Sequence, residues 1–164
     1  MKKCLILFLL SLMLAGCSTK ETFETLGNVQ HQPDNIPMAA TVQLSVPESA
    51  VVETFGGGLD TVYYCKDYTL VLQTLSSGDF SGTVRKLSGF SPEKLTVMES
   101  SIGQVKRYDW VWTAAGEGGD VLCRASVLDD GNYHYCLYTM ASAQNAGALA
   151  GEWNELFSSF CLGE

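Results

Sequence analysis

Residues 121–140 read VLCRASVLDDGNYHYCLYTM and contain the clearest structural signal in the chain. Two runs of apolar and aromatic residues flank the four residues 129–132, Asp-Asp-Gly-Asn, and a turn of this kind between such runs predicts a β-hairpin. We expect opposite residues whose numbers sum to 261, which places Cys123 opposite Tyr138 and Cys136 opposite Ala125. One face of the hairpin then carries Val121, Cys123, Ala125, Val127, His134, Cys136, Tyr138 and Met140.

The stretch before the hairpin, residues 104–114, predicts a long strand. Its alternation places Tyr108, Trp110 and Trp112 on one face, and Val105, Arg107, Asp109 and Val111 on the other. Because charged side chains favour water, we expect the charged face to be wet and the aromatic row to be core. The alternative is an exposed row that stacks on a sugar or contacts a partner protein.

The remaining segments predict further strands and two helices. We expect strands at 42–46, 51–55, 59–65, 68–75 and, as a short extended piece, 95–98, with a glycine turn at 56–58 and a hairpin turn at Lys66-Asp67. Residues 80–90 predict a short helix ended by Gly89. A longer helix is expected at 143–159 with Ser142 as its N-cap, since one apolar stripe is formed by Ala146, Leu149, Ala150, Trp153, Leu156, Phe157 and Phe160.

These elements predict a single α+β domain over residues 41–164. Its antiparallel sheet should be flanked by helices, with the C-terminal amphipathic helix packed on the sheet. Residues 17–40 are polar, contain Gly and Pro, and have no sustained periodicity, so we expect a flexible tether.

The first sixteen residues have the form of an export signal. Lys2 and Lys3 precede an apolar run of about ten residues, which is too short to span a bilayer. The run ends in Leu-Ala-Gly-Cys at 14–17, which resembles the lipobox of bacterial prolipoproteins. That resemblance implies cleavage before Cys17, lipid on Cys17 and an anchor on the extracytoplasmic side of a membrane.

The charge of the mature chain excludes some partners. Removing residues 1–16 leaves 148 residues with 8 basic and 18 acidic side chains, a formal charge of about −10. Nucleic acids and anionic lipid surfaces attract basic patches, so we expect neither as an electrostatic partner.

Four cysteines remain besides the anchor: Cys65, Cys123, Cys136 and Cys161. An even number in an exported chain permits two disulfides in three pairings, and we expect Cys123 and Cys136 to pair with Cys65 or Cys161. The alternative is four buried free thiols. No C-x-x-C motif is present, so the sequence predicts no metal site and no cofactor.

His134 and Cys136 are the one combination that suggests catalysis. Side chains at i and i+2 of a strand lie roughly 6–7 Å apart, beyond hydrogen-bonding distance, so we expect no catalytic residue.

The order of elements resembles the PsbP-like fold. The similarity rests on Trp110, Asp130-Gly131, Tyr135 and the ending Trp153…Ser159-Phe160, and the four cysteines depart from it. The resemblance implies an antiparallel sheet flanked by helices and a non-enzymatic role in binding or supporting a membrane complex.

We therefore expect a lipid-anchored envelope lipoprotein that binds a membrane-associated protein partner and is not an enzyme. The alternatives are a binder of a small apolar or glycan ligand, in a pocket lined by Trp110, Trp112 or Tyr138, and an enzyme that uses Cys136 and His134.

Overall fold

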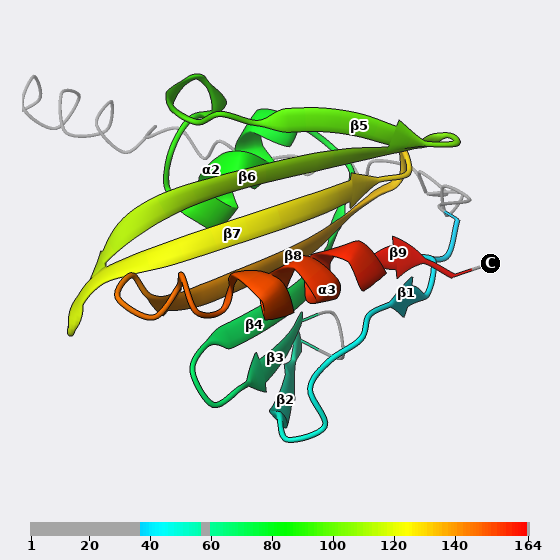
Figure 1. The fold of residues 1–164 in the computed structure, drawn as a ribbon. Coiled ribbons are helices and arrows are strands. Elements are labelled where there is room, and N and C mark those ends of the chain that lie inside the picture. The colour runs from blue at the N-terminus through cyan, green and yellow to red at the C-terminus, as the bar shows by residue number, and fades with distance from the viewer. Residues whose placement is uncertain (1–36, 57–59, 164) are drawn as a thin grey trace, which may run out of the picture. The chain divides into compact units, whose positions relative to one another are not determined.

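The computed structural model describes residues 37–56 and 60–163 (Figure 1). Over these residues the chain forms nine strands, two α-helices and one 3₁₀ turn. Their bounds are β1 Val42–Gln43, β2 Val51–Phe55, β3 Asp60–Tyr64, β4 Thr69–Ser76, α2 Phe80–Ser88, η2 Pro92–Lys94, β5 Met98–Ile102, β6 Val105–Gly116, β7 Gly119–Asp129, β8 Tyr133–Ser142, α3 Ala150–Ser159 and β9 Cys161–Leu162.

Seven strands form one antiparallel sheet in the order β2-β3-β4-β8-β7-β6-β5. Figure 1 shows α3 lying across one face of this sheet and α2 on the opposite face. The expected antiparallel sheet and its C-terminal helix are therefore present, in a chain that is mostly sheet.

The central hairpin β7–β8 forms, but its predicted register was wrong. Asp129 lies opposite His134 and Cys123 opposite Met140, so partner numbers sum to 263 and not 261. The loop is displaced because the Asp130 carboxylate accepts hydrogen bonds from the N–H groups of Asn132 and Tyr133, at 2.8 and 2.7 Å. A displacement of two residues keeps each side chain on its predicted face.

One face of β6 is buried, and the other is covered over the first part of the strand. Tyr108, Trp110 and Trp112 are buried in a core on the α2 side, as predicted. The opposite face was predicted to be wet. Val111 on this face is 51% exposed, but the side chains of Arg107 and Asp109 are only 14% and 18% exposed, so the prediction was wrong for the charged residues. The C-terminal end of α3 covers them, as the hydrogen bonds from Arg107 to the main-chain oxygens of Phe157 and Phe160 show.

The C-terminal helix is shorter than predicted. It begins at Ala150 with Leu149 as its N-cap, and Ser142 instead accepts turn hydrogen bonds from Asn145 and Ala146. Asn and Gly at 145 and 147 lower helix propensity, so turns replace the first part of the expected helix. Of the predicted stripe, the core on this side of the sheet contains Leu149, Trp153, Leu156, Phe157 and Phe160, whereas Ala150 is exposed.

Two further predictions differ in detail. The strand expected at 42–46 is reduced to β1, which pairs with β9 outside the main sheet, whereas Leu44 and Val46 pack on the core as irregular chain. Residues 95–97 are not a strand, because β5 begins only at Met98. Contact with the core begins slightly before residue 41, since the Ala40 N–H donates to the Tyr135 hydroxyl at 2.8 Å.

The hairpin β3–β4, strand β2 and helix α2 agree with the sequence. Tyr64 lies opposite Thr69 around the predicted Lys66-Asp67 turn. Helix α2 ends at Gly89, which has a left-handed φ of 76° and whose N–H donates to the Arg85 oxygen.

Candidate functional site

The predicted aromatic row is interior and does not form a binding surface. Tyr108, Trp110 and Trp112 are 8%, 1% and 7% exposed. Phe80 of α2 stacks on Tyr108 with ring centroids 3.9 Å apart and meets the edge of Trp110. Helix α2 therefore covers the face that could otherwise have stacked on a ligand.

The four cysteines are free thiols in the structure, and the expected pairing with Cys65 or Cys161 is not formed. The reason is topological. Cys123 and Cys136 belong to the core on the α2 side, whereas Cys65 packs against the core on the α3 side and Cys161 lies on β9. The sheet separates the first two cysteines from Cys65.

The environment of the buried thiols disfavours nucleophilic chemistry. Burial raises the pKa of Cys136 to about 12 and that of Cys123 to about 11. The Cys136 sulfur contacts the main-chain oxygen of His134 at 3.7 Å and not the imidazole, so the Cys–His pair considered from the sequence is not formed. A thiol that stays protonated at neutral pH is a poor nucleophile.

His134 has two polar neighbours that the sequence did not reveal. Its Nδ1 lies 2.8 Å from the Thr83 hydroxyl of α2, and its Nε2 lies 3.6 Å from Asp129 Oδ2. Asp129 is its cross-strand partner, which a correct hairpin register would have identified. The contact with Thr83 depends on how α2 packs on the sheet, and no sequence signal points to it.

The Thr83 hydroxyl, the His134 imidazole and the Asp129 carboxylate follow one another in the order found in a catalytic triad. His134 and Thr83 are only 1% and 7% exposed, however, so neither the imidazole nor the hydroxyl is open to a substrate. Buried polar groups require hydrogen-bond partners, so the arrangement serves to hold α2 on the β7–β8 hairpin.

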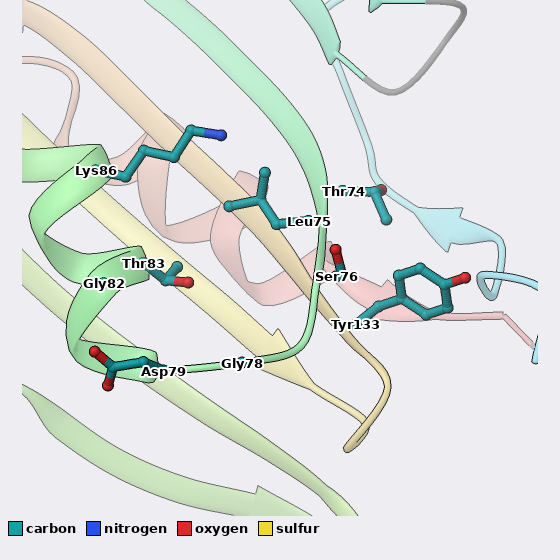
Figure 2. Close-up of a pocket in the computed structure, with 9 residues that line it drawn as sticks. All are labelled: Thr74, Leu75, Ser76, Gly78, Asp79, Gly82, Thr83, Lys86 and Tyr133. Atoms are coloured by element: carbon teal, nitrogen blue, oxygen red, sulfur yellow. The ribbon is translucent and has the colours of Figure 1, made fainter. Parts of the chain in front are cut away.

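A hollow of about 540 Å³ opens beside Thr83, between α2 and the end of β4. In Figure 2, Thr83 and Lys86 extend from α2 toward Leu75 of β4. The hollow is lined by Thr74, Leu75, Ser76, Gly78, Asp79, Gly82, Thr83, Lys86 and Tyr133.

The small-ligand alternative required a pocket lined by Trp110, Trp112 or Tyr138. Of these three residues, Trp112 borders a hollow of about 380 Å³, together with Phe90 and Leu95. Trp110 is buried beneath α2, and Tyr138 is half-buried.

The β2–β3 edge of the sheet exposes large apolar side chains. Val51, Val52 and Phe55 of β2 are 63%, 52% and 50% exposed, and Tyr64 of β3 is 44% exposed. Val51 and Tyr64 are cross-strand partners. Val51, Phe55 and Tyr64 lie on one face of this edge, and Val52 lies on the other. Exposed apolar side chains clustered at one edge are typical of a protein–protein contact.

Within residues 37–56 and 60–163 no group of three or more His, Cys, Asp or Glu side chains is placed to hold a metal ion. The helices of this part of the chain are each too short to cross a bilayer.

Comparison with known proteins identifies the fold and not the family. No family model matches the sequence, and no curated protein matches it. Among solved structures, the cyanobacterial PsbP (CyanoP) of Synechocystis sp. PCC 6803 is similar with a TM-score of 0.54 at 12% identity, over 79% of this chain and 96% of that chain. LpqN of Mycobacterium tuberculosis, described as involved in cell envelope biogenesis, is similar with a TM-score of 0.50 at 14% identity, over 80% of this chain and 88% of that chain. The described part of the chain has a PsbP-like fold.

Proposed function

We propose that this chain is an envelope lipoprotein, held outside the cytoplasm by lipid on Cys17, whose folded part binds another envelope protein without catalysing a reaction. Three observations support this role: the sequence at 14–17, a fold similar to that of LpqN and CyanoP, and pKa values that keep the buried thiols protonated. Cys17 itself lies outside the described residues.

The observation that carries the proposal is the apolar surface on the β2–β3 edge. Val51, Val52, Phe55 and Tyr64 are about half exposed, so a partner that buries the rest of one such side chain would gain on the order of 1 kcal/mol, about half of the value for complete burial. Burial of these side chains would therefore stabilise a complex, so the edge is the favoured partner-binding surface.

The partner can be captured in intact cells. A photo-cross-linking amino acid at position 55 of the full-length lipoprotein should give one reproducible protein adduct, and the paired change Val51→Asp with Val52→Asp should abolish it. The matched control places the cross-linker at Ile102, on the opposite edge strand β5, where 62% of the side chain is exposed. Absence of any reproducible adduct, or the same adducts from both edges, would count against the proposal.

The anchor has its own test. Cys17→Ala should abolish incorporation of a labelled fatty acid, whereas Cys4→Ala, within the segment that is removed, should leave it unchanged. Full labelling of the Cys17→Ala protein would refute the lipobox assignment.

A second candidate function is binding of a small ligand in the hollow between α2 and β4. Its volume of about 540 Å³ is within the range of ligand sites. Gly82→Leu would fill it, since a Cβ at Gly82 meets only Asp79 at ordinary distances, and Gly151→Leu on α3 is the matched control with no atom within 4 Å. Apolar and glycan compounds should raise the Tm of the wild type and of the control but not of Gly82→Leu. A compound that raises all three Tm values equally binds elsewhere.

A further inference from the structure

Strand β2 is an edge strand of the main sheet. Among the described residues it pairs with β3 alone, through five consecutive residue pairs from Val51↔Tyr64 to Phe55↔Asp60, and Figure 1 shows it as the last strand on its side. In an edge strand, alternate residues point their N–H and C=O groups away from the sheet. Proteins usually protect such edges with charged side chains, proline or a bulge, and Val-Val-Glu-Thr-Phe at 51–55 has one charge, Glu53, and no proline or lysine.

The centre of this edge carries one carboxylate. Glu53 lies on the same strand face as Val51 and Phe55, and its Oε2 accepts a hydrogen bond from the Tyr64 hydroxyl at 3.2 Å. Glu53 forms no ion pair with the described residues, and its charge is the main cause of the raised pKa of Tyr64.

The opposite edge strand, β5, differs in the pairing of its carboxylate. On β5 the carboxylate of Glu99 is paired with Lys106 at 3.6 Å, and the centre of the strand is Ser100-Ser101. Met98 and Ile102 of β5 are 64% and 62% exposed, as apolar residues of β2 are, so the difference is one of charge. The carboxylate of Glu53, which has no ion pair among the described residues, makes a segment with a basic residue complement β2 better than β5.

Charge also disfavours a second copy of this chain as the occupant. An antiparallel pair of β2 strands that places Val51 opposite Phe55 also places Glu53 opposite Glu53. Like charges directly opposite in a sheet are destabilising, and a mature chain of formal charge about −10 adds long-range repulsion.

We infer that β2 accepts an extended segment of the partner protein as an additional strand, with the pattern apolar–x–basic–x–apolar, whose Lys or Arg side chain pairs with Glu53 between Val51 and Phe55. This inference rests on the proposed partner-binding function and names the chemistry of the partner. Main-chain hydrogen bonds to the edge supply affinity, and the position of the basic residue supplies register and specificity.

The probe is the capped peptide acetyl-TSVTKTVST-amide, with acetyl-TSVTETVST-amide as its charge-reversed counterpart. Binding to the full-length mature lipoprotein in detergent should be about three- to tenfold weaker for the glutamate peptide, because an attractive cross-strand pair becomes a repulsive one. Glu53→Lys should reverse this order, whereas Glu99→Lys on β5 should preserve it. Both positions are exposed, so both variants should fold.

Hydrogen exchange and sedimentation distinguish a partner segment from other occupants of the β2 edge. The outward amides of β2 should exchange rapidly in the free protein and become protected when the lysine peptide is added. Equal affinity for both peptides, an order that Glu53→Lys does not reverse, or amides already protected in the free monomer would overturn the inference. A dimer in sedimentation that Glu53→Lys changes would assign the edge to a second copy. An adduct from position 55 whose cross-linked segment lacks the basic pattern would overturn this inference alone and leave the proposed function standing.

Discussion

The guanidinium of Arg107, on β6, donates a hydrogen bond of 2.9 Å to the main-chain oxygen of Phe157, near the end of α3. A second, longer bond of 3.4 Å reaches the oxygen of Phe160, and Asp109 holds the guanidinium with bonds of 2.9 and 3.2 Å. The last carbonyls of a helix lack partners within it, so a strand residue satisfies them here and fixes α3 on the sheet.

Replacing Arg107 should therefore loosen α3. Arg107→Met leaves Asp109 without its cation and two helix carbonyls without a donor, and should lower the free energy of unfolding by about 2–3 kcal/mol. Urea denaturation measures this. Lys106→Met, next to it but with 55% of its side chain exposed, should leave the free energy of unfolding close to that of the wild type. Equal effects of the two variants would show that the carbonyl contacts contribute nothing.

The contact between Thr83 and His134 should stabilise α2 on the hairpin. Thr83→Val keeps the shape of the side chain but leaves Nδ1 of a buried imidazole without a partner, and should cost about 1–3 kcal/mol. Thr113→Val, at an exposed position on β6, is the control and should be close to neutral. In a double-mutant cycle with His134→Leu, additive effects of the two changes would contradict the proposed coupling.

Asp130 should make the free energy of unfolding depend on pH in the acidic range. Burial alone would raise its pKa, but N–H groups of Tyr133 and Asn132 and the Tyr135 hydroxyl stabilise the carboxylate, so its pKa is lowered. A carboxylate with a lowered folded pKa contributes stability above its unfolded pKa, about 3.9, and loses it as pH falls through the folded pKa.

Asp130→Asn should therefore be less stable than the wild type at pH 7, by about 1–2 kcal/mol, and the difference should shrink as the pH falls from about 4 through the lowered folded pKa of Asp130. Chemical denaturation between pH 7 and 2 tests this. Tyr135→Phe should show a smaller effect of the same sign, and Tyr133→Phe, whose hydroxyl has no hydrogen bond to the described residues, serves as the control. Parallel curves for Asp130→Asn and wild type would contradict the assignment.

The thiols should react in an order set by burial. Cys123 and Cys136 have raised pKa values of about 11 and 12 and are buried, so iodoacetamide at pH 8 should modify them only after unfolding. The half-buried Cys65 and Cys161 should react first. Mass spectrometry of the native and denatured protein gives the order. A native mass lower by about four hydrogens would reveal two disulfides and contradict the free-thiol state.

Local sequence was sufficient where a short segment sets its own geometry. The presence of a hairpin at 121–140, though not its register, the end of α2 at Gly89 and the burial of the aromatic row of β6 follow from turn residues and period-two alternation, which operate over a few residues. The lipobox prediction at Cys17 is equally local, and it stays a prediction.

The tertiary structure decided what depends on residues far apart in the chain. The meeting of Thr83 with His134, the capping of Phe157 by Arg107 and the placement of Cys65 across the sheet from Cys123 follow from how α2 and α3 dock on opposite faces. No local pattern encodes the direction from which a helix covers a sheet. The same is true of the exposed β2 edge, because whether a strand is central or last depends on the order in which all seven strands pair.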